Sequence, residues 1–490
     1  MTAVSPKTSY QLTILTVLGA ILRFVNLGRD SLWLDEAISY LAARLPVTQI
    51  ANNTVQSSHP PFYYLLLHLW LNIVPDSDTA VKLLSTLFGI LLIPAVYFLS
   101  QQLFENRTIS LTAAALTAVS PFHILYSHEL RMYTLLMLLV VLATAVTLHT
   151  RQKESNGWWL VAGGLWLMAV YTHLFAFLAL AGVGLHALLN FRQNKRAFWA
   201  TTILTAVILV CFIPWLNLML GEAQPDLGSL RPLQSAEILN PLKPLTAPVF
   251  LLFGMSNTFW YSGICLFIVI AYLIILTMEL RKLGRTQIPS GLKLTMIIIA
   301  SVLGVPVLVY LVRPFFLPER TLAAAAPFLA ILLAWGMSRR QSPLPYLTGL
   351  ALLLMLAGTM IYHLGPLVKP PYRDAAAFVV ENAQPGDLVL HTSDGSYLPA
   401  LRYAPQLTQG VLAGDPDPRK PEAVYAALGG QVWEMADVEA MANGRFWVIV
   451  ALEHSIEWQQ AQYDTITARH TLLDEQDIGG IRIFLFELGD

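Results

Sequence analysis

Long apolar runs recur along the chain from near its N-terminus to about residue 364, and they constrain the fold more than any other feature. A helix of about 20 apolar residues crosses a hydrocarbon layer about 30 Å thick. Only 12% of the 490 residues are charged and 56% are hydrophobic, whereas about 25% of residues are charged in soluble domains. The composition excludes a soluble enzyme and predicts a polytopic α-helical membrane protein.

Polar interruptions divide the apolar runs into eleven expected membrane helices, give or take one. The expected spans are residues 10–27, 79–103, 108–122, 131–150, 158–172, 174–190, 197–215, 258–280, 294–312, 321–338 and 346–364. The first run also fits a cleaved signal peptide, because Lys7 precedes an apolar stretch that ends in small residues. We favour an uncleaved span, since cleavage would remove the anchor ahead of the first large loop.

Lysines and arginines gather at alternate ends of the expected spans, and this alternation predicts the orientation. The residues are Lys7, Arg107, Arg151, Lys153, Arg192, Lys195, Arg196, Arg281, Lys282, Arg285, Arg339 and Arg340. Short cytoplasmic loops carry the positive excess in membrane proteins. We therefore expect a multi-pass protein of the cell (plasma or inner) membrane with a cytoplasmic N-terminus. Residues 28–78, residues 216–257 and everything after residue 364 are then expected outside.

The chain is expected to have two domains, a transmembrane domain at 1–365 and an extracytoplasmic α/β domain at 366–490. The segment PLVKPPYRDAAAFVVENAQPGDLVLHT predicts a helix, a turn and a buried strand, and the apolar runs at 446–452 and 481–488 predict further strands. No glycine-rich nucleotide loop occurs there. The net charge of −1 gives no indication of nucleic-acid binding. Cys211 and Cys265 lie in apolar runs and are expected to be small buried hydrophobes.

The first outer loop carries the densest group of candidate catalytic residues. Asp35 and Glu36 begin a segment whose apolar spacing suits a short interfacial helix. Adjacent residues on a helix point about 100° apart, so only one of the two acids can face a given cavity. Both acids also suit a helix N-terminus for purely structural reasons. His59 precedes two prolines that open a second apolar helix, where a capping role is the alternative.

Further polar residues are expected at the outer ends of later spans. Glu129, Arg131 and Tyr133 are expected at the N-terminal end of a membrane helix, with Glu129 and Tyr133 on one face. Such an end attracts anions, although an ion pair that closes the bundle is the alternative. His173 occupies a tight turn between two short spans, and Arg320 lies beside Glu319 before a small-residue helix. Together these residues predict an outward-facing polar cavity for a lipid-linked anionic substrate.

Several motifs in order give the chain a family resemblance. LRFVNLGRDSLWLDEA, HPPFYYLLLHLW, KLLSTLFGIL, SPFHILYSHELRMYTLL, YTH and PER-TLAAAAPFLAILLAWG resemble the successive motifs of GT-C glycosyltransferases of the family 39 type. These include protein O-mannosyltransferases, the lipid A aminoarabinose transferase and a bacterial dolichyl-phosphate-mannose-protein mannosyltransferase-like branch. The resemblance covers roughly residues 20–380. It implies many transmembrane helices, interfacial helices in the first outer loop, and a polyprenyl-phosphate-sugar donor used on the outer face.

Carried over to this chain, the resemblance places the loop acid at Asp35, beside Glu36, and the second acidic motif at Glu129. His59 stands where the aminoarabinose transferase has a lysine. Arg320 matches the arginine of the late motif, although Thr321 follows it instead of a tyrosine.

The expected reaction is an inverting sugar transfer to a lipid, glycan or protein acceptor, with Asp35 as general base. Arg131, Arg320, His59 and His173 are the candidates to stabilise the leaving phosphate, and Tyr133 is expected to line the substrate site. A divalent ion (Mg, Mn or Zn) held by Asp35, His59 and Glu129 would do similar work, and the sequence leaves that alternative open. The expected partners are the donor lipid, an unidentified acceptor and membrane lipids.

Two other functional classes compete with the transferase hypothesis. A transporter or flippase would place ionisable residues near the middle of the membrane and relate its halves by a repeat. The ionisable residues of this chain instead lie at span ends, and no repeat is evident. A non-catalytic assembly scaffold would need none of the acids.

Overall fold

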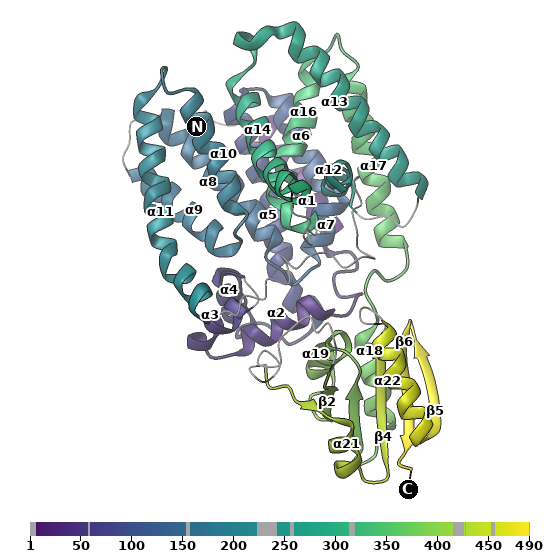
Figure 1. The fold of residues 1–490 in the computed structure, drawn as a ribbon. Coiled ribbons are helices and arrows are strands. Elements are labelled where there is room, and N and C mark those ends of the chain that lie inside the picture. The colour runs from purple at the N-terminus through teal and green to yellow at the C-terminus, as the bar shows by residue number, and fades with distance from the viewer. Residues whose placement is uncertain are drawn as a thin grey trace.

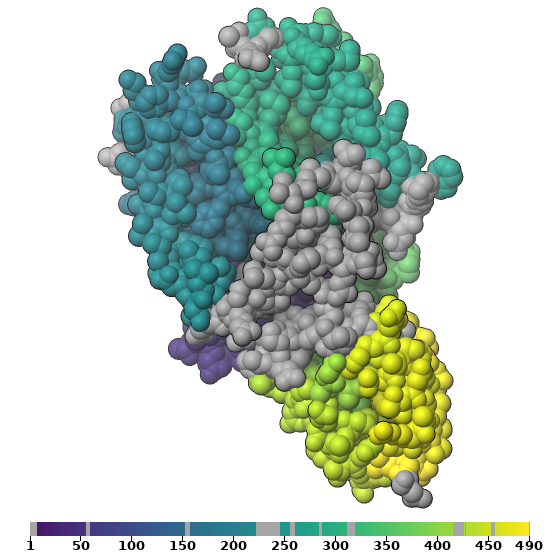
Figure 2. Space-filling view, viewed as in Figure 1, coloured from purple at the N-terminus to yellow at the C-terminus, as the bar shows by residue number. Residues whose placement is uncertain are grey.

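The protein has a helical part followed by a smaller C-terminal α/β domain that projects from one end of it (Figures 1 and 2). A computed structural model describes residues 6–56, 59–152, 157–222, 243–254, 259–312, 319–414, 426, 428–451 and 456–489. We call the end of the helical part beside the C-terminal domain the domain end, and the opposite end the far end.

Each predicted span corresponds to a helix or to a run of consecutive helices. They are α1 (Pro6–Phe24), α5 (Asp78–Phe104), α6 (Arg107–Val119) with α7 (Pro121–Ser127), α8 (Tyr133–Gln152), α9 (Gly157–Thr172), α10 (Ala176–Leu189), α11 (Lys195–Glu222), α13 (Phe259–Gln287), α14 (Ser290–Ile299) with η2 (Ala300–Gly304) and α15 (Val305–Val312), η3 (Glu319–Ala325) with α16 (Ala326–Trp335) and η4 (Gly336–Ser338), and α17 (Leu344–Leu364). Among the described residues, seven helices are long and apolar enough to cross a membrane, or eight if the bent pair α6 and α7 forms one span. A polytopic membrane protein is thereby confirmed, and the number eleven stays a prediction.

Short helices lie between the first two spans, as predicted for the first outer loop. They are α2 (Leu34–Arg44), α3 (Val47–Gln56) and α4 (Phe62–Leu71). The three lie at the domain end, close to the C-terminal domain (Figure 1). A further helix, α12 (Lys243–Phe253), precedes α13, while residues 223–242 of the predicted outer loop lie outside the described part.

The helices alternate in direction, so the described basic residues that set the predicted orientation lie at the far end, while Lys153 lies outside the described residues. Arg107 begins α6, where α5 has just ended, and Arg339 and Arg340 follow η4. The candidate site residues lie at the domain end, where α2 begins and α7 ends. The structure is consistent with the predicted threading, and which end faces the cytoplasm stays a prediction. Both cysteines are free thiols; Cys265 is buried as expected, but Cys211 is exposed on α11.

The C-terminal domain is built on a six-stranded mixed sheet of order β3-β2-β1-β4-β6-β5. Its strands are β1 (Leu388–His391), β2 (Thr408–Leu412), β3 (Val432–Trp433), β4 (Arg445–Ala451), β5 (Thr471–Ile478) and β6 (Ile481–Glu487). β3, β2, β1 and β4 are parallel, whereas β6 pairs antiparallel with β4 and β5. The helices are α18 (Tyr372–Asn382), α19 (Asp394–Tyr403), α21 (Met435–Met441) and α22 (Ile456–Arg469).

The predicted strands and the helix after the last span are present as β1, β4, β6 and α18. β5 was not predicted, because it is an exposed edge strand whose sequence TLLDEQDI has no apolar alternation.

The C-terminal domain is held to the helical part by packing and by a partly buried ion-pair network. Tyr397 and Leu398 of α19 pack in one apolar cluster with residues of α2. Arg402 of α19 bonds Asp76 at 2.9 Å and Asp78 at 3.0 Å, and its guanidinium lies 4.1 Å from the centre of the Tyr40 ring. The Tyr403 hydroxyl donates to Asp78 at 2.8 Å. The domain therefore supports α2 directly.

Replacing Arg402 with Gln should loosen this junction. It removes one of the two arginines that pair with the buried carboxylate of Asp78. Breaking a buried ion pair costs about 3–5 kcal/mol, and Arg373, which stays 3.0 Å from Asp78, places the expected cost at or below the lower end of that range. We expect a lower unfolding temperature and faster proteolysis near residues 365–371. The control is Arg482→Gln, which breaks an exposed pair with Glu475 and should cost roughly 0–1 kcal/mol. Equal effects of the two substitutions would contradict a stabilising junction.

Candidate functional site

The candidate site begins with the N-terminus of α2, which Glu36 fixes in place. The Glu36 carboxylate accepts from the Trp33 N–H at 3.3 Å, which caps its own helix. It also accepts from the Leu130 N–H at 2.7 Å and lies 2.7 Å from Nζ of Lys369. The side chain of Glu36 is fully buried. We predicted Glu36 as a catalytic candidate, but these contacts show a carboxylate occupied in holding α2.

Asp35 points away from Glu36, as adjacent residues on a helix must. Its carboxylate lies 3.0 Å from Nη2 of Arg320, and its side chain stays 19% exposed, against 0% for Glu36. The Arg320 guanidinium lies 5.4 Å from the centre of a Trp33 ring. Of the two adjacent acids, Asp35 is the one that a substrate can reach.

Arg131 joins α2 to the turn before α8. One guanidinium nitrogen donates at 3.1 Å both to the Asp35 carbonyl oxygen and to the Ser39 hydroxyl. Another lies 3.2 Å from Nε2 of His59. Both predicted arginines therefore contact Asp35, Arg320 at its side chain and Arg131 at its backbone. Arg131 is 5% exposed and already engaged, whereas the side chain of Arg320 is 26% exposed.

The two predicted histidines lie next to Arg131 and Tyr133. The ring centres of His59 and His173 are 6.5 Å apart, and those of His173 and Tyr133 are 6.1 Å apart. Because a guanidinium only donates, His59 must accept the bond from Arg131 and be neutral. Nδ1 of His173 accepts from the Phe175 N–H at 3.1 Å, and burial and then Arg131 lower the pKa of His173 to about 4. In this arrangement both histidines are hydrogen-bonded acceptors, and their role as candidates to stabilise the leaving phosphate stays a prediction.

The sequence predicted Glu129 at the N-terminal end of a membrane helix, but in the structure this residue precedes the helix. α8 begins at Tyr133, so Glu129 and Arg131 lie in the bend after α7 and Glu129 shares no helix face with Tyr133. The helix is interrupted because the Leu130 N–H bonds to Glu36 instead of to a helical carbonyl. One carboxylate oxygen of Glu129 is buried with no hydrogen-bond partner in the described part of the chain. Burial raises the pKa of Glu129, and nearby Lys369 opposes that rise.

Two buried lysines belong to this region and were not predicted. Lys369 comes from the segment after the last span and is 8% exposed, and burial alone would lower its pKa, yet Glu36 and Glu129 raise it. Lys82 on α5 donates to the Asp30 carbonyl oxygen at 2.6 Å. A single lysine between Pro-rich positions (PLVKPP) gives no local signal, because its partner lies 333 residues earlier. A lysine inside an apolar span, as at position 82, is a signal that we did not use.

The predicted metal set is not assembled. Among the residues that the structure describes, no group of three or more His, Cys, Asp or Glu side chains is placed to hold a metal ion. Asp35 faces Arg320, and Nε2 of His59 faces Arg131, so cations already occupy both positions. Asp35, His59 and Glu129 therefore do not fit a preformed site, and we derive no step through a metal.

The pH dependence of stability tests the buried state of Glu129. A raised pKa in the folded protein gives stability that is present below the ordinary glutamate pKa of about 4.3 and is lost as the pH rises above it. Glu129→Gln removes this loss. We expect the unfolding temperature of the variant, relative to the wild type, to increase between about pH 5 and about pH 8. Glu381→Gln, at an exposed position of α18, is the control and should show no such trend.

Comparison with known proteins supports the fold. The family model described as dolichyl-phosphate-mannose-protein mannosyltransferase matches residues 58–217. ArnT from Cupriavidus metallidurans in the apo state has 12% identity and a TM-score of 0.64, covering 98% of each chain. The same protein bound to undecaprenyl phosphate has 13% identity and a TM-score of 0.59, covering 96% of this chain and 97% of that one.

An archaeal structure is similar over nearly the whole chain. Archaeal oligosaccharyltransferase AglB from Archaeoglobus fulgidus, in complex with an inhibitory peptide and a dolichol-phosphate, has 14% identity and a TM-score of 0.50. The alignment covers 98% of this chain and 74% of that one. No curated protein sequence matches the chain significantly.

The chain shares the fold of the ArnT structures over nearly its whole length. The family model confirms the predicted similarity to dolichyl-phosphate-mannose-protein mannosyltransferases over residues 58–217.

Proposed function

We propose that this protein transfers a sugar from a polyprenyl-phosphate donor to an acceptor hydroxyl, with Asp35 as general base. The observation that carries the proposal is the accessible Asp35 carboxylate paired with Arg320, an acid and a cation side by side in a GT-C fold. The ArnT structure with undecaprenyl phosphate and the AglB structure with dolichol-phosphate support a lipid phosphate as the donor's carrier.

In the proposed reaction, the acceptor oxygen attacks the anomeric carbon from the face opposite the phosphate. Its proton passes to the Asp35 carboxylate as the new glycosidic bond forms. The bond between the anomeric carbon and the phosphate oxygen breaks, and the lipid phosphate leaves with the electron pair. The sugar configuration is inverted in this single displacement.

Arg320 is suited to hold the leaving phosphate because it is the more exposed of the two arginines that contact Asp35. The donor phosphodiester, which carries one negative charge, competes with Asp35 for the guanidinium, and the phosphate gains a second charge as the sugar leaves. Charge-assisted contacts to phosphate are about twice as strong as neutral ones. Once Arg320 turns to the phosphate, the Asp35 carboxylate is freed for the acceptor. Donor binding would thus prepare the base. Arg131 contributes by fixing the backbone of Asp35 and by adding positive charge nearby.

The remaining site residues support these two. Glu36 and Lys369 fix the direction in which α2 presents Asp35. Burial favours the neutral form of Glu129, so we assign it a hydrogen-bonding role toward a hydroxyl of the sugar or acceptor. His59, Tyr133 and His173 form the wall beside Arg131. The acceptor is a lipid, a glycan or a protein.

Asp35→Asn should lower the transfer rate by roughly 10²- to 10⁴-fold, the usual contribution of a general base. The measurement is transfer of labelled sugar from polyprenyl-phosphate-sugar in liposomes. Donor binding and the unfolding temperature should change little, since the side chain is partly exposed. Normal activity of this variant would contradict the assignment of the base, whereas absence of transfer by the wild type would favour a transporter or a scaffold.

Glu36→Gln is the matched control at the adjacent position. It strands the buried Lys369 ammonium, so it should lower the unfolding temperature far more than Asp35→Asn does. The double variant Glu36→Gln with Lys369→Met should recover part of that stability. Equal losses of activity without any loss of stability at Asp35 and Glu36 would show that the wrong carboxylate was chosen.

Arg320→Lys should weaken donor use about 10- to 100-fold, because one hydrogen bond to a charged group is worth about 1.5–3 kcal/mol. Lysine keeps the charge but lacks the planar fork that binds two phosphate oxygens. The loss should appear as a higher KM for the donor. The control is Arg339→Lys at the far end, where Arg339 binds Glu279, and it should change the donor KM less. An unchanged donor KM would contradict phosphate binding by Arg320.

A further inference from the structure

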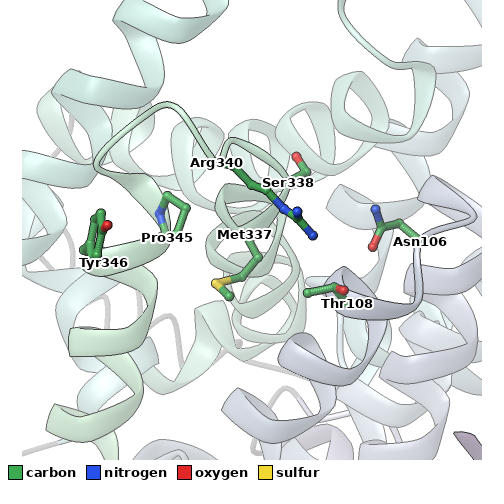
Figure 3. A pocket seen from close by; sticks show the side chains of 7 residues that line it. All are labelled: Asn106, Thr108, Met337, Ser338, Arg340, Pro345 and Tyr346. Atoms are coloured by element: carbon green, nitrogen blue, oxygen red, sulfur yellow. The ribbon is translucent and has the colours of Figure 1, made fainter.

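A polar cavity lies at the far end of the helical part, away from the candidate site. Its volume is about 380 Å³, and it lies between the start of α6, the end of η4 and the start of α17 (Figure 3). It is lined by Asn106, Thr108, Met337, Ser338, Arg340, Pro345 and Tyr346. No step of the proposed transfer reaction uses it.

The lining is rich in hydrogen-bond donors and contains no acid. Arg340 has no ion pair or hydrogen bond within the described part of the chain, whereas the adjacent Arg339 is paired with Glu279 at 2.9 Å. In Figure 3 the Arg340 side chain extends between Ser338 and the pair Asn106 and Thr108. Oδ1 of Asn106 caps α6 by accepting from the Ile109 N–H at 3.1 Å, which leaves its NH₂ group as a donor. A guanidinium, an amide and a hydroxyl without a carboxylate favour an anion.

The apolar side of the cavity favours an anion that carries acyl chains. Met337, Pro345 and Tyr346 form this side. Tyr346 is 81% exposed at the start of α17, and tyrosines gather at membrane interfaces. Leu350 and Leu353 lie one and two turns further along α17 and are 40% and 63% exposed. The cavity therefore lies at the start of an apolar strip, formed by Tyr346, Leu350 and Leu353, that runs along the surface of α17.

We propose that this cavity binds the phosphate head group of an anionic phospholipid, with Arg340 as its principal contact and the acyl chains along α17. Phosphate is the shared chemistry of such a lipid and of free phosphate, but only the lipid uses the apolar strip. The far end carries the basic residues that predict a cytoplasmic position, and anionic lipids attract basic residues at that surface. The inference does not depend on the proposed transfer reaction.

Native mass spectrometry of the full-length protein with added phosphatidylglycerol or phosphatidylcholine tests the proposal. The wild type should retain phosphatidylglycerol in preference to phosphatidylcholine. Arg340→Gln should reduce the retained phosphatidylglycerol about tenfold, as loss of one charged contact predicts. Arg192→Gln is the matched control, because Arg192 is an exposed arginine at the same end and does not line the cavity. Equal losses from the two variants would overturn the proposal.

Two further measurements keep the proposal testable if Arg340→Gln folds poorly. Thr108→Val keeps the side-chain shape and removes one donor, so it should reduce phosphatidylglycerol retention about two- to fivefold, a smaller effect than loss of a charged contact. Inorganic phosphate is added to protein in phosphatidylcholine nanodiscs, and the unfolding temperature is recorded. We expect little stabilisation by inorganic phosphate and clear stabilisation by phosphatidylglycerol. Arg340-dependent stabilisation by inorganic phosphate alone would identify a soluble ligand and overturn the lipid proposal.

Discussion

The buried ion pair between Glu36 and Lys369 is the interaction on which the arrangement of the site depends. Two charges leave water here, at a cost that is recovered only where each finds close partners. Glu36 does so by accepting from Lys369 and from the Trp33 and Leu130 N–H groups. These contacts join α2, the bend before α8 and the segment after the last span. The buried Glu36 side chain therefore sets the direction in which Asp35 points.

The two arginines near this ion pair differ in how firmly their present contacts hold them. Arg131 is held by the Asp35 carbonyl, Ser39 and His59, and it has little freedom to move to a ligand. Arg320 has the accessible carboxylate of Asp35 as its ion-pair partner and stays partly exposed. A preorganised cation lowers the barrier at a developing charge only if the ligand can displace its resting partner. The exposed pair meets that requirement.

The sequence predicts most of what local patterns determine. Apolar run lengths located the spans, and the apolar spacing after Asp35 located α2, because both depend on residues close in sequence. The motifs brought Asp35, Arg131 and Arg320 together, and the structure places both arginines on Asp35. The predicted helix at Glu129 was wrong and Lys369 was missed for one common reason. Both depend on Glu36, whose partners lie 94 and 333 residues away, and such pairing leaves no trace in local periodicity.

The position of Lys369 in the chain has a consequence for biosynthesis. The segment that carries it follows α17, and Arg402 follows later still, so both supports of α2 are made after every membrane helix. Until residue 369 leaves the ribosome, the Glu36 carboxylate lacks the lysine that lies 2.7 Å from it, and α2 lacks that contact. A chain that is still being made, or that ends early within α17, therefore contains Asp35 and Glu36 but lacks the contacts that position them. Maturation of the site therefore follows completion of the last span and requires the residues after it.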